Sequence, residues 1–188
     1  LEPDIRAFVD ALLDTESFID RLTGIGTLDH GLAESLGAVG VAARASGVAR
    51  DARLDHPYAA YAPGALVPVT GAAGDVRARM LVRIDEVFAS FALIRRFLGE
   101  LAELAPGGLV VPVGSLPPER WAMSVVESPR GEDVHWVMTG REGEIYRYRV
   151  RSASYNWALV PFAVVGNLLP DFPLINKSFE LCYACLDR

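Results

Sequence analysis

Two cysteines near the end of the chain are the residues best suited to chemistry. Cys182 and Cys185 are the only cysteines among 188 residues, and two residues separate them. Two thiolates at this spacing can bind one soft metal ion from one side, but they cannot fill a four-coordinate site without further ligands. The pair therefore predicts either half of a metal site or no metal site, and the residues alone leave this choice open.

Two other kinds of cysteine chemistry are disfavoured. A redox dithiol of the thioredoxin type needs a strand before the C-x-x-C and a helix after it, whereas only three residues follow Cys185. A zinc site needs two more ligands. The three histidines, which are His30, His56 and His135, are not spaced as a second ligand pair. His56 stands in a charged loop and is expected to be solvated.

The bulk properties of the chain favour one globular domain. At 188 residues and 20.4 kDa it can bury a sizeable core. The net charge of -6 disfavours a nucleic-acid partner. The mean hydropathy of +0.24 indicates either a core rich in alanine and valine or a surface that a partner or missing chain covers. No apolar run reaches the roughly 18 residues that span a bilayer, so no membrane span and no signal peptide are expected.

Hydrophobic periodicity predicts a long core helix in the middle of the chain. Apolar residues recur at helical spacing from Val76 to Leu101, and Asp75 stands where a helix begins. A loop rich in proline and glycine is predicted before it, over 62–74, and Pro106-Gly107-Gly108 is expected to end it. Its charged side chains are assigned to a solvated face, which is their usual place: Arg77, Arg79, Arg83, Asp85, Glu86, Arg95 and Arg96.

The first third of the chain predicts two further helices and a stretch of small residues. One amphipathic helix is expected over Ile5 to Leu22, and a shorter one over Asp29 to Leu36. Small residues fill 37–47, which lets backbones approach closely. Arg44 is the one large polar residue among them, and it is expected at the surface, at the end of a helix.

The last third predicts a small sheet followed by another helix. Three short strands are expected over 124–127, 134–138 and 145–150, with turns at 128–131 and 140–143. A helix is expected from Ser154 or Tyr155 to Gly166, with Pro161 as a kink or a late start. Asp171-Phe172-Pro173 is expected to break it. The fold class is therefore α+β, mostly helical, with a small antiparallel sheet.

Several stretches, taken together, resemble the large subunits of nickel–iron hydrogenases and the 49-kDa-type subunit of NADH–quinone oxidoreductase, the respiratory complex I. The energy-converting, formate hydrogenlyase-type hydrogenases are the most similar branch. The matching stretches follow the chain in order: Thr23-Gly24-Ile25-Gly26, Arg44-Ala45-Ser46-Gly47, Asp55-His56-Pro57-Tyr58, Gly74-Asp75 with Arg79, Glu127-Ser128-Pro129-Arg130-Gly131 with His135-Trp136, Ala153-Ser154-Tyr155-Asn156-Trp157, and Cys182-Tyr183-Ala184-Cys185-Leu186-Asp187-Arg188.

The resemblance implies roles for three residues. Cys182 would bind nickel and Cys185 would bridge nickel and iron. Arg130 would lie over the metals and donate charge-assisted hydrogen bonds near them. The nickel–iron centre of the full-length protein would need an earlier C-x-x-C, which this chain lacks. We therefore expect 1–188 to be a single domain, the C-terminal part of a longer large subunit, with no nickel–iron centre and no activity by itself.

The resemblance also implies a setting for the full-length protein. It would interconvert hydrogen and protons in a membrane-associated redox complex, beside an iron–sulfur small subunit and membrane subunits. Its expected location is the cytoplasm, peripheral to the inner face of the cell membrane. The alternative is a metal-free structural subunit of the complex I type. Glu180-Leu181 favours that alternative, since Asp-Pro often precedes the first cysteine in the hydrogenase relatives.

Overall fold

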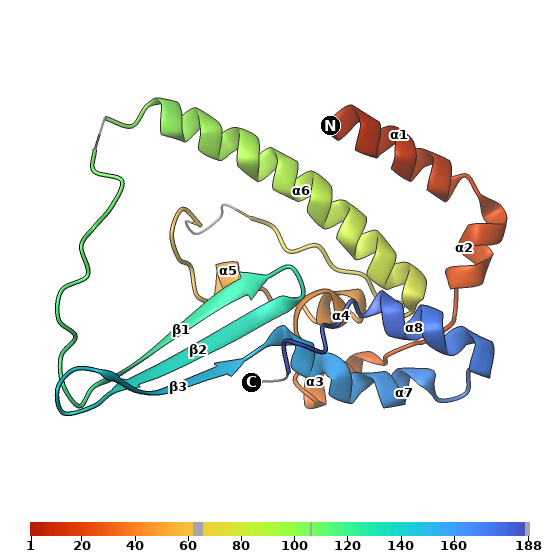
Figure 1. Ribbon diagram of the computed structural model, residues 1–188. Helices are drawn as coiled ribbons and strands as arrows, with labels where there is room; N and C mark the ends of the chain where they lie inside the picture. The colour runs from red at the N-terminus through yellow and green to blue at the C-terminus, as the bar shows by residue number, and fades with distance from the viewer. Residues whose placement is uncertain (62–65, 106, 187–188) are drawn as a thin grey trace.

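The computed structural model describes residues 1–61, 66–105 and 107–186 (Figure 1). Parts of three expectations lie outside these residues: the beginning of the 62–74 loop, Pro106 at the end of the long helix, and Asp187 and Arg188 of the C-terminal motif. None of the helices within the described ranges has both the length and the apolarity that crossing a bilayer requires.

Helices surround the base of a small antiparallel sheet, as the fold class predicted (Figure 1). The described elements are, in order, α1 (Glu2–Leu13), α2 (Glu16–Leu22), α3 (His30–Ser35), α4 (Gly40–Ala45), α5 (Ala52–Asp55), α6 (Val76–Ala102), β1 (Trp121–Ser128), β2 (Gly131–Thr139), β3 (Ile145–Arg151), the 3-10 helix η1 (Ala153–Leu159), α7 (Val160–Val164), the 3-10 helix η2 (Leu169–Asp171) and α8 (Phe172–Ser178).

Asp75 begins α6 as predicted, and it also ties the helix to the first third of the chain. One carboxylate oxygen accepts from the Ala78 N–H at 2.7 Å, which caps the helix. The other accepts from the Gly24 N–H at 2.8 Å, in the turn after α2. One carboxylate therefore fixes both the start of α6 and the end of α2 relative to it.

Most of the buried residues of α6 lie in its first half, and Leu93 is the described exception in the second half. Val76, Ala78 and Val82 are buried there, whereas Leu98 and Leu101 in the second half are about 60% exposed. Figure 1 shows the second half running out above the strands, away from the cluster of short helices. The apolar period therefore predicted the helix but not how much of it is covered.

The prediction of a single helix over Ile5 to Leu22 is wrong, because the helix is interrupted near Thr15. This residue has an extended backbone (φ -88°, ψ 91°) and begins α2. Its hydroxyl donates to the Ala11 carbonyl at 2.9 Å, so it satisfies a carbonyl at the end of α1. The two helices share an apolar period because both turn one face inward.

The sheet matches the predicted strands and order but is longer. β2 pairs with both β1 and β3, antiparallel in each case. Ser128 pairs with Gly131, so β1 and β2 are joined by the two residues Pro129 and Arg130. A short hairpin loop fixes the register of its strands and the position of its own residues.

The helix predicted after the sheet, with its break at Asp171-Phe172-Pro173, is only partly confirmed. Pro161 lies in the first turn of α7, where its missing N–H costs nothing, so the late start is confirmed. The predicted break at Asp171-Phe172-Pro173 is instead the beginning of α8, with Pro173 in the first turn. A proline two residues after an aspartate is compatible with both the end and the start of a helix, and packing of α8 against α6 and α7 selects the start.

Two glycines hold the β1–β2 turn against α4. A Cβ at Gly40 would lie 2.1 Å from the Arg130 carbonyl oxygen, and a Cβ at Gly131 would lie 2.7 Å from the Gly40 Cα. Gly40 also has a positive φ of 64°. Only a residue without a Cβ allows this backbone contact, which places the turn over the small-residue segment as that composition predicted.

We predict that Gly40→Ala destabilises the protein by about 3 kcal/mol or more, because it adds a backbone clash to the strain of a positive φ. Gly37→Ala is the matched control. Gly37 has a φ of 67° but nothing within 4 Å of its added Cβ, so only the strain of about 1 kcal/mol applies. Urea unfolding of both variants measures the difference. Equal losses would show that the close contact contributes nothing.

Candidate functional site

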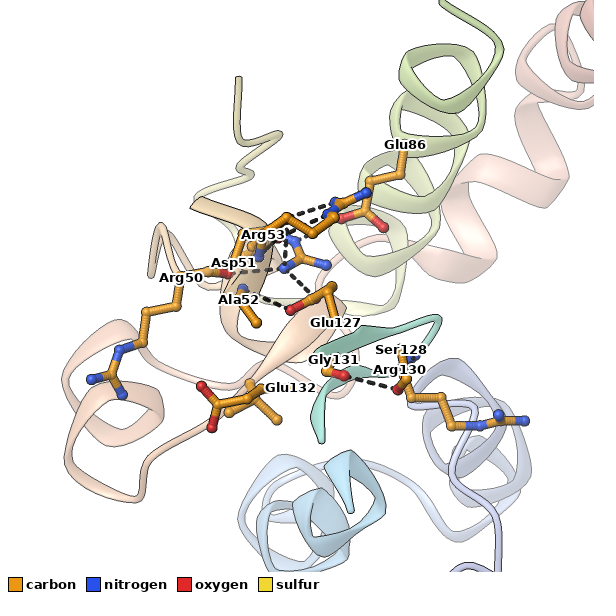
Figure 2. Close-up of polar contacts among 12 residues, drawn as sticks. Arg50, Asp51, Ala52, Arg53, Glu86, Glu127, Ser128, Arg130, Gly131 and Glu132 are labelled. Carbon is orange, nitrogen blue, oxygen red and sulfur yellow. Dashed lines mark hydrogen bonds and ion pairs between the residues drawn. The ribbon is translucent and has the colours of Figure 1, made fainter. Parts of the chain in front are cut away.

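The β1–β2 turn directs Arg130 toward the C-terminal segment. The Ser128 hydroxyl donates to the Gly131 carbonyl at 2.8 Å, which closes the turn. The Arg130 Nε donates to the backbone carbonyl of Glu180, fifty residues later. Figure 2 shows the Arg130 side chain leaving the turn in the direction away from Glu127. Arg130 therefore contacts the segment that leads into the cysteines, rather than solvent at a surface turn.

Cys182 and Cys185 are both partly buried and have free thiols. The Cys182 N–H donates to the Ser154 hydroxyl at 3.3 Å. Hydrogen bonds from the side chain and backbone of Cys185, with a smaller contribution from the charge of Arg130, lower the pKa of the Cys182 thiol. Within the described residues, the three predicted site residues thus meet around the segment 180–185.

Further metal ligands do not join the cysteines from elsewhere in the described ranges. In those ranges no group of three or more His, Cys, Asp and Glu side chains is arranged to hold a metal ion. The His30 Nδ1 lies 2.9 Å from the Ser46 carbonyl oxygen, and the His135 Nδ1 lies 2.5 Å from the Tyr148 hydroxyl. His56 is exposed, as expected.

Arg44 forms a buried ion-pair network that sequence reasoning missed. The expectation of a surface arginine is wrong: the residue is 1% exposed. Its Nε donates to Glu86 at 2.6 Å, and its Nη1 donates to Glu127 at 2.9 Å and to the Arg50 carbonyl at 2.9 Å. The signal was present, because an arginine within the small residues of 37–47 must lie where backbones pack closely.

Glu127 connects this network to the β1–β2 turn. Its second carboxylate oxygen accepts from the Ala52 N–H at 3.0 Å, and its own N–H donates to the Tyr58 hydroxyl at 3.1 Å. Burial raises the pKa of Glu127 more than the neighbouring charge of Arg44 lowers it. Figure 2 shows Glu127 beside Ala52, on the opposite side of the turn from the Arg130 guanidinium.

Asp51 shows the opposite balance. Burial raises the pKa of its carboxyl. Hydrogen bonds from Arg53 and the charges of Arg53 and Arg44 together lower this pKa by more than burial raises it, so the net shift is downward. The Arg53 Nε and Nη2 donate to its two oxygens at 2.9 and 2.6 Å. Such a bidentate pair is the strongest kind of arginine–carboxylate contact.

Arg79 is a second buried arginine, and its assignment to a solvated helix face is wrong. It is 0% exposed. Its two terminal nitrogens donate to the carbonyls of Gly74 and Gly26 at 2.6 and 2.8 Å, and its Nε donates to Ser178. Burial and the charge of Arg83 lower the pKa of Arg79 to about 9, which leaves it charged at neutral pH.

A cavity of about 550 Å³ lies beside the Arg44 network. Its polar wall includes Arg44, Arg53, Arg83, Glu86 and Glu127. Its apolar wall is the face of α6 that carries Val87, Phe91 and Ile94. The cavity lies on the Glu127 side of the turn, and Cys182 and Cys185 do not line it.

We predict that Arg44→Met destabilises the protein by about 3–5 kcal/mol, because Glu127 and Glu86 would lose the cation that compensates for their burial. Arg77→Met is the control. Arg77 lies exposed on α6, so its loss should change the free energy of unfolding by less than about 0.5 kcal/mol. Urea unfolding at pH 7 compares the two variants. A similar effect in both would mean that the network is not stabilising.

We predict that Asp51→Asn costs about 2 kcal/mol of stability at pH 7 and that this loss shrinks in acid. Because the folded-state pKa of Asp51 is lowered, its carboxylate contributes fully above the unfolded pKa of about 4. The contribution is lost as pH falls through the lower folded value. Unfolding free energies at pH 7, 5 and 3 measure the trend, and Asp85→Asn at an exposed site of α6 should show none. A pH-independent loss would contradict the assignment.

Comparison with known proteins agrees with the motifs. The chain matches the family described as "Respiratory-chain NADH dehydrogenase, 49 Kd subunit" over residues 1–113 and 109–188. It is 40% identical to "Formate hydrogenlyase subunit 5" of Escherichia coli (strain K12), over 98% of this chain and 32% of that protein. It is 32% identical to an NADH-quinone oxidoreductase subunit of Herpetosiphon aurantiacus, over 96% of this chain and 50% of that protein.

A solved structure confirms the fold. A chain of "the membrane-bound sulfane sulfur reductase (MBS), an archaeal respiratory membrane complex" superimposes with a TM-score of 0.88 at 28% identity, covering 99% of this chain and 52% of that one. This chain spans between about a third and a half of the length of these relatives. This chain is therefore similar to subunits of both a formate hydrogenlyase and an NADH-quinone oxidoreductase. Since the family match covers the whole chain, the protein belongs to the 49-kDa subunit family of respiratory-chain NADH dehydrogenases.

Proposed function

We propose that this chain is the C-terminal part of the large subunit of a nickel–iron hydrogenase-like, membrane-associated redox complex. The observation that carries the proposal is the contact between the Arg130 turn and the segment that leads into Cys182. The Arg130 side chain thus contacts the backbone two residues before Cys182, fifty positions later in the sequence. The relatives named for formate hydrogenlyase and membrane-bound sulfane sulfur reductase support the redox setting.

The chemistry of the residues fits half of a nickel–iron site. Thiolates are suitable ligands for nickel and iron, and the lowered pKa of Cys182 favours its thiolate form. Cys182 and Cys185 would hold the metals from one side, and Arg130 would donate charge-assisted hydrogen bonds beside them. The bound metals would supply the exchange of hydrogen with protons and electrons. The remaining ligands would come from a second cysteine pair outside 1–188.

The proposal includes the setting of the full-length protein. Residues 1–188 form a single domain of a longer subunit. This domain by itself is inactive and holds no nickel–iron centre. An iron–sulfur small subunit passes electrons to or from the site, and membrane subunits complete the complex. The whole is peripheral to the inner, cytoplasmic face of the cell membrane. Its family membership and the respiratory membrane complex that shares its fold support this setting.

A metal-free subunit of the complex I type is the second candidate function. Glu180-Leu181 before Cys182 favours it, as does the identity with the NADH-quinone oxidoreductase relative. The two candidates differ in one observable feature of the full-length gene. A C-x-x-C upstream of residue 1 supports the hydrogenase, and its absence supports the metal-free subunit.

We predict separate effects for Arg130→Lys and Cys185→Ser in the complete complex, produced with its maturation proteins. Lysine keeps the charge but loses the planar, forked donor, so hydrogen turnover should fall by about 100-fold while nickel and iron are retained. Serine removes a thiolate, so the metals themselves should be lost. Arg141→Lys, an exposed arginine at the other end of the sheet, should behave like the unchanged protein.

Metal analysis and hydrogen uptake by the same preparations measure these effects. Absence of nickel in the unchanged complex would refute the hydrogenase proposal and leave the metal-free subunit. Full activity of Arg130→Lys would show that Arg130 has no role at the site.

A further inference from the structure

The segment that carries the cysteines rests on one face of η1. The Ser154 hydroxyl is fully buried and accepts from the Cys182 N–H at 3.3 Å. The ring of Trp157 stacks on that of Tyr183, with 4.6 Å between centroids and 31° between planes. Residues three apart in a 3-10 helix project in the same direction. Ser154 and Trp157 therefore hold two consecutive residues of the cysteine segment.

η1 is itself fixed by two other parts of the fold. The Asn156 side chain is buried and bonds both backbone groups of Val39: its Oδ1 accepts from the N–H at 3.3 Å and its Nδ2 donates to the carbonyl at 2.8 Å. The Ala153 N–H donates to the Asp133 carboxylate of β2 at 2.6 Å. η1 is thus connected to the start of α4 and to the sheet. These two elements also hold the turn that carries Arg130.

The indole of Trp157 serves as a surface rather than as a hydrogen-bond donor. Its Nε1 is buried and has no hydrogen-bond partner among the residues that the structure describes. A buried N–H without a partner is a free-energy cost. The contact of its large ring with Tyr183 offsets this cost, since an aromatic pair fixes both the distance and the orientation of the two side chains.

We propose that Ser154 and Trp157 are positioning residues for the thiols of Cys182 and Cys185. The segment is held at three successive points: at Glu180 by Arg130, at Cys182 by Ser154 and at Tyr183 by Trp157. These restraints fix the backbone that carries both thiols, next to the residue that Arg130 contacts. The purpose of this placement, a metal site, rests on the proposed function, whereas the restraint itself does not need a metal.

The test is amide hydrogen exchange of the Cys182 N–H, measured by NMR on residues 1–188 without added nickel or iron. Ser154→Ala removes the acceptor without adding bulk, and we expect about tenfold faster exchange. Trp157→Ala removes the stack, with a similar increase. Trp157→Phe keeps a stacking ring and loses the unpaired N–H, so it should stay within about twofold of the unchanged protein. Tyr155→Ala is the control, since Tyr155 is 53% exposed on the same helix.

A second measurement reads the thiols directly. The rate of alkylation of Cys182 and Cys185 by iodoacetamide should rise several-fold in Ser154→Ala and Trp157→Ala, and it should not rise in Trp157→Phe or Tyr155→Ala. Amides in the middle of α6 report global unfolding, and Trp157 also packs against the core, so in the alanine variants these amides should accelerate by a smaller factor than the Cys182 N–H.

Three outcomes would overturn the inference. They are unchanged Cys182 exchange in both alanine variants, failure of Trp157→Phe to keep the protection, and acceleration at α6 equal to that at Cys182. A parent complex without nickel would refute the proposed metal site and leave the exchange results, and therefore the positioning role, in place.

Discussion

The burial of the Arg44 guanidinium is the constraint on which the arrangement of the chain depends. A cation removed from water is tolerated only when anions and carbonyls surround it. Its partners come from α6 (Glu86), from β1 (Glu127) and from the segment before α5 (Arg50). One side chain therefore fixes the long helix, the sheet and a loop relative to α4. Glu127 lies three residues before Arg130, so the same network determines where the β1–β2 turn begins.

A second group of contacts places that turn beside the cysteines. The Gly40–Gly131 contact sets the turn against the start of α4. Asn156 bonds the backbone of Val39, immediately before Gly40. The turn and η1 thus contact adjacent residues, Gly40 and Val39, from different parts of the chain. Arg130 reaches the cysteine segment from one of these supports, and Ser154 and Trp157 reach it from the other, so the site is assembled around the start of α4.

The high hydropathy of the chain has two sources: a core rich in alanine and valine, and exposed apolar side chains. The buried apolar residues are mostly alanine and valine. Large apolar side chains are also exposed in several regions, among them Leu98 on α6, Trp121 on β1 and Leu169 in η2. Exposed apolar surface of this kind is usual in a subunit that is covered by other chains. It agrees with the proposed place of this protein in a larger complex.

The sequence by itself determined the elements whose signals are local. The Asp75 cap, the apolar period of α6, the alternating strands and the turn residues all act within a few positions, so α6 and the sheet were predictable. The break at Thr15 and the start of α8 at Phe172 were not, because the same residues permit two local conformations. Only tertiary packing chose between them.

The site shows the same division. The types and spacing of Cys182 and Cys185 allowed either half of a soft-metal site or no metal site. The motif resemblance singled out Arg130 before any geometry was known. The burial of Arg44 and Arg79 was decided by contacts over 42 to 99 positions of sequence. A charged side chain on a helix has the same local signal whether it faces water or a carboxylate from a distant strand. The small residues around Arg44 hinted at close packing, but the partners of both arginines are supplied by the fold, so only the tertiary structure could reveal what holds them.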